Sequence, residues 1–220
     1  MSGAAANPTA VGPRRLDLPP AFTPRHALDA AFAAALVGAA AGADPGTIYW
    51  TPRRDAVDLA VVLTPELPRA ECPLTAILGL AALGDALAAV APPNAPVGFA
   101  WPDRVLVDGA TAGGVRLAID PGEPPEWVVL GVALDVTGRT ETADPGLDLA
   151  RTWLHEEGFG EVSVEDVVEA FARHFQSWVD RWMQDGFGPA IARWRHDATD
   201  APDDLARHDL AAAFARPSWL

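Results

Sequence analysis

The sequence predicts an α+β fold, in which helices pack on a mixed, largely antiparallel sheet. Short runs of β-branched and aromatic residues follow one another through the first two thirds of the chain, separated by turn residues, as is typical of antiparallel strands. Helical patterns precede, interrupt and follow these runs. Helices segregated from an antiparallel sheet define the α+β class.

The N-terminal part predicts a tail, a helix and two strands. Residues 1–20 are rich in Ala, Pro and Gly and lack a basic start followed by an apolar stretch, so we expect a flexible tail rather than a signal peptide. Residues 25–41 have helical composition and end at glycine and proline, which predicts a core helix. The runs 47–50 and 56–63 predict two strands joined by a short basic loop.

The middle of the chain predicts a buried helix and then strands in succession. Residues 73–91 are apolar nearly all round and end in two prolines, which predicts a buried helix. The Asp108-Gly109 pair favours a tight hairpin turn, because these residues adopt positive φ at low cost. Further strands are expected at 97–101, 104–107, 114–119 and 127–136.

The C-terminal part predicts a long helix with a marked start. Ser163 and Asp166 are spaced as a capping box, and apolar residues then recur at helical intervals until Gly186. Pro189 predicts the first turn of a second short helix. We therefore divide the chain into the tail 1–20, one domain over 21–198, and an acidic, alanine-rich C-terminal helix or tail over 199–220.

Composition excludes several functions. The 16 basic residues are all arginines, so no lysine serves as a catalyst, a phosphate clamp or a Schiff-base nucleophile. The net charge of −14 argues against a nucleic-acid partner. A single cysteine, Cys72, permits no internal disulfide, and no apolar stretch is a good membrane span, so we expect a cytoplasmic protein without membrane contact.

Common catalytic signatures are absent from the sequence. It contains no Gly-x-Ser-x-Gly elbow and no phosphate-binding loop ending in Gly-Lys-Ser/Thr. His155 is followed by Glu156 and Glu157, but no second histidine lies four residues after it, so we expect no metal there.

A known family is nevertheless visible in three ordered motifs. Residues 99–115, FAWPDRVLVDGATAGGV, resemble the central stretch of biotin-protein ligases, where Lys-Trp-Pro-Asn-Asp, a strand, a turn and Lys-x-x-Gly-Ile follow at this spacing. The run 127–136, WVVLGVALDV, is similar to the family's Val-x-Gly-Ile-Gly-Ile-Asn-Val strand, and 171–194 is similar to its Trp-x-x-x-Trp-x-x-x-Gly ending. The resemblance over roughly residues 25–196 implies the catalytic-domain fold of the biotin/lipoate-protein ligases, which is like that of class II synthetases.

The departures from the family fall where its chemistry lies. The lysine of Lys-x-x-Gly-Ile is replaced by Thr111, the Asn-Asp pair by Asp103 and Arg104, and the later asparagine by Asp135. The family's Gly-Arg-Gly-Arg ligand loop is reduced to residues 51–55, Thr-Pro-Arg-Arg-Asp. Adenylation needs positive groups that converge on the transferred phosphate, and added carboxylates oppose a triphosphate.

Three functions remain open at this point. The first is a divergent family member that has lost ATP-dependent adenylation, needs no cofactor, and binds a small carboxylic acid or a biotinyl or lipoyl carrier domain. The second is an active biotin- or lipoate-type ligase or acyltransferase, using ATP and biotin or lipoate, with Arg53, Arg54 and Arg104 in place of the lysine. The third is a structural partner subunit, which predicts an exposed apolar patch and a homodimer.

The candidate ligand-binding residues follow from the resemblance. For Gly113 and Gly114, a retained ligand contact and a strand that needs close backbone approach are both open. For Trp101, packing is favoured over binding. The full candidate set is Arg53, Arg54, Trp101, Asp103, Arg104, Thr111, Gly113, Gly114 and Asp135, with no metal ligand.

Overall fold

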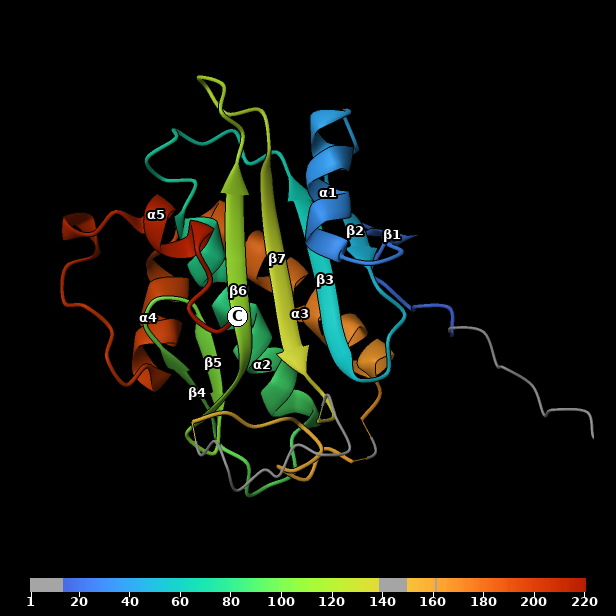
Figure 1. Ribbon diagram of the computed structural model, residues 1–220. Coiled ribbons are helices and arrows are strands. Elements are labelled where there is room, and N and C mark those ends of the chain that lie inside the picture. The colour runs from blue at the N-terminus through green and yellow to red at the C-terminus, as the bar shows by residue number, and fades with distance from the viewer. Residues whose placement is uncertain (1–13, 139–149, 161) are drawn as a thin grey trace, which may run out of the picture.

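A twisted sheet forms the centre of the molecule (Figure 1). The structure is a computed structural model that describes residues 14–138, 150–160 and 162–220. Within them the sheet has seven strands in the order β1-β2-β3-β7-β6-β5-β4, and only the β1–β2 pair is parallel. The strands are β1 Thr23–His26, β2 Thr47–Trp50, β3 Ala56–Leu63, β4 Val97–Ala100, β5 Arg104–Val107, β6 Ala110–Ile119 and β7 Val128–Asp135. The predicted α+β class is confirmed.

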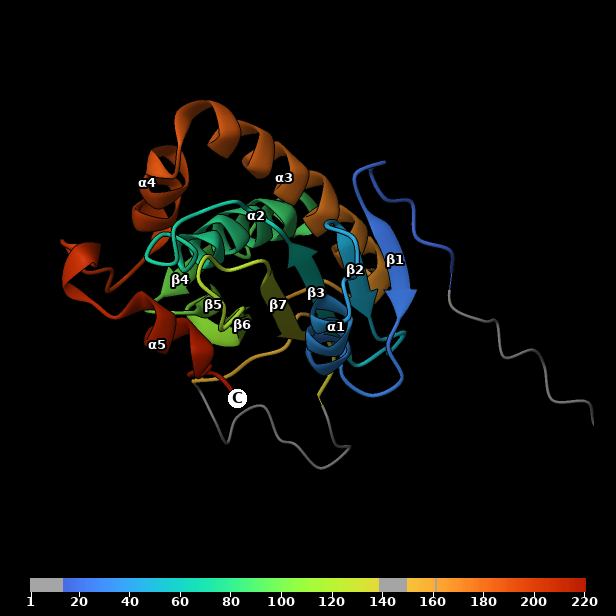
Figure 2. The ribbon, with the colours of Figure 1, turned by 90° about the horizontal axis from the view of Figure 1, so that it is seen from above.

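Helices cover both faces of this sheet, but unequally. Seen from above, α2 and α3 lie on one face together with α4, while α1 and the C-terminal part with α5 lie on the other (Figure 2). The helices are α1 Ala31–Ala40, α2 Leu74–Val90, α3 Val164–Asp185, α4 Gly188–Asp197 and α5 Leu210–Ala215, with a 3₁₀ turn, η2, at Leu205–Arg207.

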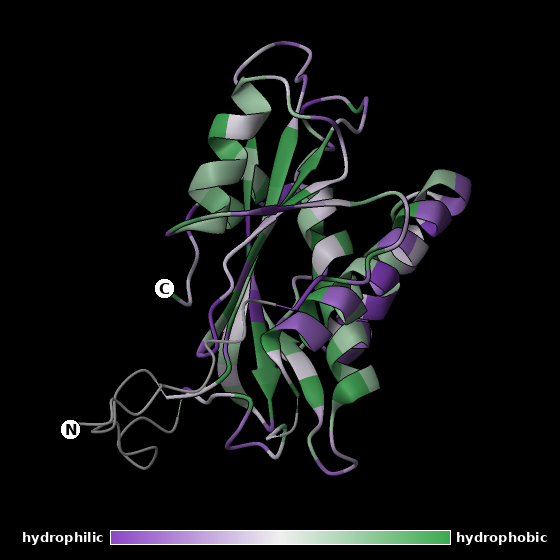
Figure 3. Ribbon diagram, turned by 90° about the vertical axis from the view of Figure 1, so that its right-hand side faces the viewer, coloured by the Kyte–Doolittle hydropathy of each residue, from purple (hydrophilic) through white to green (hydrophobic). Residues whose placement is uncertain are grey.

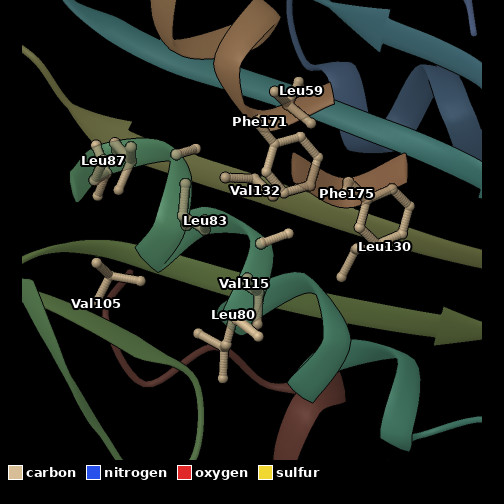
Figure 4. Packing of buried hydrophobic residues seen from close by; sticks show 14 of the residues in the cluster. Leu59, Leu80, Leu83, Leu87, Val105, Val115, Leu130, Val132, Phe171 and Phe175 are labelled. Atoms are coloured by element: carbon tan, nitrogen blue, oxygen red, sulfur yellow. The ribbon is translucent and has the colours of Figure 1, made fainter. Parts of the chain in front are cut away.

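The main core lies between the sheet and α2 and α3 (Figure 4). Leu80, Leu83 and Leu87 of α2 pack there with Val115 and Val132 of the sheet. The nearly all-round apolar pattern of residues 73–91 has its physical cause here, because α2 is covered by the sheet on one side and by α3 and α4 on the other. The helix predicted at 73–91 is confirmed.

The first helix departs from the expectation. Residues 25–41 do not form one helix: Thr23–His26 is an exposed edge strand paired with β2, and α1 begins only at Ala31. Nor is α1 a core helix, since only Ala31, Ala35 and Ala39 are buried, while Val37 is 72% exposed. An edge strand that contains a proline and exposes all its side chains has no alternating apolar pattern. Such a strand is therefore not predicted by its local sequence.

The hairpin of β5 and β6 confirms the predicted turn and corrects one boundary. Asp108 and Gly109 both have positive φ, as a type I′ turn requires. The strand expected at 114–119 begins at Ala110, and its pairing with β5 shifts register between Val105 and Leu106. The extra residue of this bulge explains why residues 110–113 show no regular strand pattern.

The long helix α3 begins as predicted. The Ser163 side chain accepts a hydrogen bond from the Asp166 backbone N–H, and the Asp166 carboxylate accepts one from the Ser163 backbone. Phe171 and Phe175 lie on its buried face, and its outer face is mostly hydrophilic (Figure 3). Capping and amphipathicity together define this helix without help from the rest of the chain.

Both terminal segments contact the domain. Of the expected tail 1–20, residues 1–13 lie outside the described residues, but Leu16 is buried and Arg14 forms ion pairs with Asp166 and Glu169 of α3 at 2.9 and 3.1 Å. In the C-terminal segment 199–220, α5 buries Phe214 completely. No helix within the described ranges is long and apolar enough to cross a membrane.

Candidate functional site

A pocket of about 240 Å³ lies on the face of the sheet that carries α1. Figure 1 shows α1 in front of β3 and the C-terminal end in front of β6, with β7 in view between them. The pocket occupies this interval, so its floor is sheet and its two sides are the start of α1 and the segment 218–220. Its lining consists of Asp29, Ala30, Arg53, Ala56, Val57, Asp58, Gly113, Arg116, Ala133, Leu134, Asp135, Arg151, Trp219 and Leu220.

Charged residues dominate the polar part of this lining. Three are arginines and three are aspartates, so the pocket as a whole is close to neutral. Two of the arginines are engaged by carboxylates: Arg53 by Asp55 and Arg151 by Asp135. The third, Arg116, is different.

Arg116 has no anionic contact among the described residues. Its guanidinium lies over the Phe32 ring, 4.2 Å from the centroid, and makes no hydrogen bond or ion pair to any side chain in the described part of the chain. Burial lowers its pKa and the charge of Asp58 opposes this shift. A half-buried guanidinium without a partner is a strong anion-binding group, because its five donors fit a carboxylate in a two-pronged contact.

The sheet makes room for this arginine. Gly131 is paired with Arg116 across β6 and β7, and an added Cβ on Gly131 would lie 2.6 Å from the Phe32 ring and 3.0 Å from Cγ of Arg116. The absence of a side chain at Gly131 therefore allows the ring and the guanidinium to stack over the sheet.

Arg53 and Arg54 differ in their position relative to the pocket. Arg53 lines the pocket, but its Nε and Nη2 donate to both carboxylate oxygens of Asp55 at 2.9 and 2.5 Å, and this hydrogen bonding raises its pKa. Arg54 is exposed and is not among the pocket residues. The short loop therefore presents no free arginine to the pocket.

Asp58 and Asp135 are positioned by neighbouring elements. The Asp58 carboxylate accepts a hydrogen bond from the Ala31 backbone N–H at 2.9 Å and so satisfies one free donor at the start of α1. Asp135, at the end of β7, contacts Arg151 at 3.3 Å. These carboxylates add negative charge to the same pocket that holds Arg116.

Thr111, Gly113 and Gly114 lie along β6. Thr111, the counterpart of the family lysine, is buried, and its backbone pairs with Ala150 and Thr152. Gly113 has φ of +151°, lines the pocket, and would place an added Cβ 2.1 Å from the Ala133 carbonyl oxygen. Close backbone approach is thus sufficient to explain Gly113, and the pocket lies beside it.

Asp103 holds the C-terminal segment and does not line the pocket. Its carboxylate is completely buried and accepts hydrogen bonds from the backbone N–H and the hydroxyl of Ser218, at 2.8 and 2.5 Å. Burial raises its pKa, and the Ser218 hydrogen bonds oppose this shift. Asp103 therefore does not add its charge to the pocket, because Ser218 covers this carboxylate.

Trp101 and Arg104 also lie outside the pocket lining. The Trp101 ring packs against Trp194, His208 and Phe214, which agrees with the packing role favoured from the sequence. Arg104 is paired with Gly114 across β5 and β6, and its Nε is buried without a hydrogen-bond partner among the described residues.

Several pocket residues were not predicted from the sequence. Arg116 had a visible signal, because it is a charged residue inside an otherwise apolar strand and lies two positions after Gly114. No local sequence signal marked four other lining residues, because they reach the pocket from four separate segments. These are Asp29, Asp58, Arg151 and Trp219. No group of three or more metal-ligating side chains occurs in the described ranges, which include His155.

Fold and pocket together define an α+β domain with a small, charged pocket on one face of its sheet. Residues 18–196 match the model of the Biotin/lipoate A/B protein ligase family. This match spans most of the chain, so the protein belongs to that family. Among curated proteins, none matches the chain.

Solved structures agree with this assignment. A biotin protein ligase-like protein of unknown function from Silicibacter sp. TM1040 is similar, with 28% identity and a TM-score of 0.75 over 88% of this chain and 86% of that one. The biotin protein ligase from Aquifex aeolicus has a TM-score of 0.65 at 15% identity, covering 81% and 78% of the two chains. The same enzyme in complex with biotin and ATP has a TM-score of 0.57 at 14% identity, covering 71% and 70%. The two Aquifex comparisons show that the fold is shared.

Proposed function

We propose that this protein binds a small carboxylic acid in the charged pocket and does not activate it with ATP. The observation that carries the proposal is Arg116, a half-buried guanidinium that lines the pocket without an anionic partner among the described residues. A bound carboxylate would complete its hydrogen bonding and compensate the cost of burying its charge.

The size and charge of the pocket argue against a nucleotide. Drug-sized ligands occupy pockets of roughly 300–1,000 Å³, whereas this pocket measures about 240 Å³. The residues present do not fit a triphosphate, because the three aspartates of the lining offset its three arginines and leave no net positive charge to balance several phosphate charges. A small acid with one carboxylate matches both the volume and the guanidinium of Arg116, which has no anionic partner in the part of the chain that the structure describes.

The ligase alternative finds less support. It requires arginines that converge on the reacting phosphate, but Arg53 is bound to Asp55, and Arg54 and Arg104 do not line the pocket. The charged pocket favours a small ligand over both the carrier-domain alternative and the structural-subunit alternative.

Calorimetric titration tests the proposal. Short carboxylic acids are titrated into the wild-type protein and into Arg116→Ala, alongside ATP with magnesium. We expect an acid to bind the wild type and to bind Arg116→Ala about 10- to 100-fold more weakly, because a hydrogen bond to a charged group contributes roughly 1.5–3 kcal/mol. We expect no heat from ATP.

The matched control is Arg54→Ala, which removes an exposed arginine outside the pocket. It should bind the acid as the wild type does. Equal losses in both variants would mean that only the general charge of the protein matters, and micromolar binding of ATP would contradict the proposal that activation has been lost.

A further inference from the structure

The segment 218–220 forms one side of the pocket, although it lies more than a hundred residues from the sheet strands it contacts. Trp219 is 6% exposed, and its indole Nε1–H donates to the Val115 carbonyl oxygen at 3.2 Å. Together with Leu220 it lines the pocket on the side toward β6.

Two residues are adapted to this segment, Gly114 on β6 and Asp103 in the turn before β5. An added Cβ on Gly114 would lie 2.5 Å from the Trp219 ring, so the indole lies directly on the strand backbone. Asp103 buries a carboxylate completely, and its two oxygens accept hydrogen bonds from the backbone N–H and the hydroxyl of Ser218. Burying a carboxylate is costly unless it is hydrogen-bonded. The hydrogen bonds from Ser218 therefore offset the desolvation cost of the Asp103 carboxylate.

We infer that Trp219 closes the β6 side of the pocket and thereby limits the length of the acid that binds, with Asp103 as the positioning residue that holds it. This inference rests on the proposed function. The indole covers Gly114 of β6, whose neighbour on β5 is Arg104. With the indole removed, the pocket extends over Gly114, and the chain of a longer acid is buried in the space that the ring leaves.

The first experiment is a chain-length series of straight-chain monocarboxylic acids, from acetate to decanoate, titrated into the wild type and Trp219→Ala. In the wild type, affinity should reach a maximum at a short chain. In Trp219→Ala the maximum should move to longer chains, with about a tenfold gain once two further methylenes are buried. Trp182→Ala is the matched control, because Trp182 lies on α3 on the opposite face of the sheet and should leave the length profile unchanged.

The second experiment examines the attachment without any ligand. Hydrogen exchange of a peptide containing residues 217–220 is compared among the wild type, Asp103→Asn and Asp108→Asn. Asp103→Asn should speed exchange at the Ser218 amide at least several-fold, because a neutral amide is a weaker acceptor than a buried carboxylate. Asp108 is exposed in the hairpin turn, so its variant should exchange as the wild type does.

The outcomes separate the inference from the proposed function. Acids that bind with the same length profile in folded Trp219→Ala as in the wild type would overturn the inference and leave the proposed function intact. Unchanged exchange in Asp103→Asn would overturn the positioning role. If the wild type binds no acid but Trp219→Ala does, closure by Trp219 stands and the proposed function of the wild type fails. If neither binds an acid, both fail.

Discussion

Individual residues in this site are explained by what lies within a few ångströms of them. Arg116 stacks on Phe32 only because Gly131 leaves the space above β7 empty. Since the chain has no lysine, every fixed cation is a guanidinium, which stacks on aromatic rings and grips carboxylates in two places. A free arginine in a pocket is therefore a more specific anion receptor than an ammonium group in the same place would be.

Gly113 yields a prediction at the residue scale. We expect Gly113→Ala to lower the free energy of unfolding by about 1–3 kcal/mol, because φ of +151° is strained for alanine. The added Cβ would also lie 2.1 Å from the Ala133 carbonyl oxygen, which is backbone and cannot swing aside. Urea unfolding followed by circular dichroism measures the loss.

Gly188→Ala is the matched control for this glycine. An added Cβ on Gly188 meets nothing within 4 Å, and the residue begins α4, where alanine is the better helix former. Its stability should equal or slightly exceed that of the wild type. A Gly113→Ala protein as stable as Gly188→Ala would show that the bulge of β6 can relax around a side chain.

At the scale of elements, local signals decided which segments form helices and strands. The strands β2 and β3 and the helices α2 and α3 lie where their apolar patterns and end signals place them. By contrast, β1 has four exposed residues and owes its conformation to pairing with β2. Elements with an apolar pattern and end signals in their own sequence are predictable. An edge strand that forms only by hydrogen bonding to its neighbour is not.

The capping box of α3 gives the prediction at this scale. Ser163→Ala should destabilise the protein by about 0.5–2 kcal/mol, because the Asp166 backbone N–H loses its acceptor at the start of the helix. Urea unfolding at neutral pH measures the change in midpoint.

Ser177→Ala provides the comparison within the same helix. The Ser177 hydroxyl is exposed and donates back to the Arg173 carbonyl oxygen, a contact that contributes nothing to a helix end. We expect this variant to be neutral or slightly stabilised. If Ser163→Ala and Ser177→Ala behave alike, the cap is not what stabilises the start of α3.

At the scale of the whole molecule, charge is the dominant electrostatic property. The chain has 30 acidic residues and 16 arginines, so the excess negative charges within the folded protein repel one another at neutral pH. Several of its ion pairs are exposed, such as Arg207 with Asp204, and contribute little. Screening should therefore relieve more repulsion than it removes attraction.

This balance predicts the response to salt. Raising sodium chloride from 10 to 150 mM, which shortens the Debye length to roughly 8 Å, should raise the melting temperature in calorimetry. The effect should shrink as the pH is lowered and carboxylates are protonated, because the net negative charge falls. A melting temperature that drops with added salt would mean that the ion pairs outweigh the general repulsion.

The site was only partly predictable. Arg53, Gly113 and Asp135, chosen by their place in motifs, do line the pocket, and Arg54, Trp101 and Arg104 do not. Motif spacing locates a position along a strand, but the direction of a side chain depends on register and on bulges. Arg116 was missed because its meaning depends on Phe32 and Gly131, which come from other elements.

The sequence by itself determined the α+β class, the family, most element boundaries and the lack of any lysine, because these are read from local patterns and composition. Only the tertiary structure decided the site. The contact of Ser218 and Trp219 with Asp103 and Val115 joins residues more than a hundred positions apart, and no local pattern encodes it. Packing of α1 and the segment 218–220 on one face of the sheet creates a pocket that neither segment forms alone.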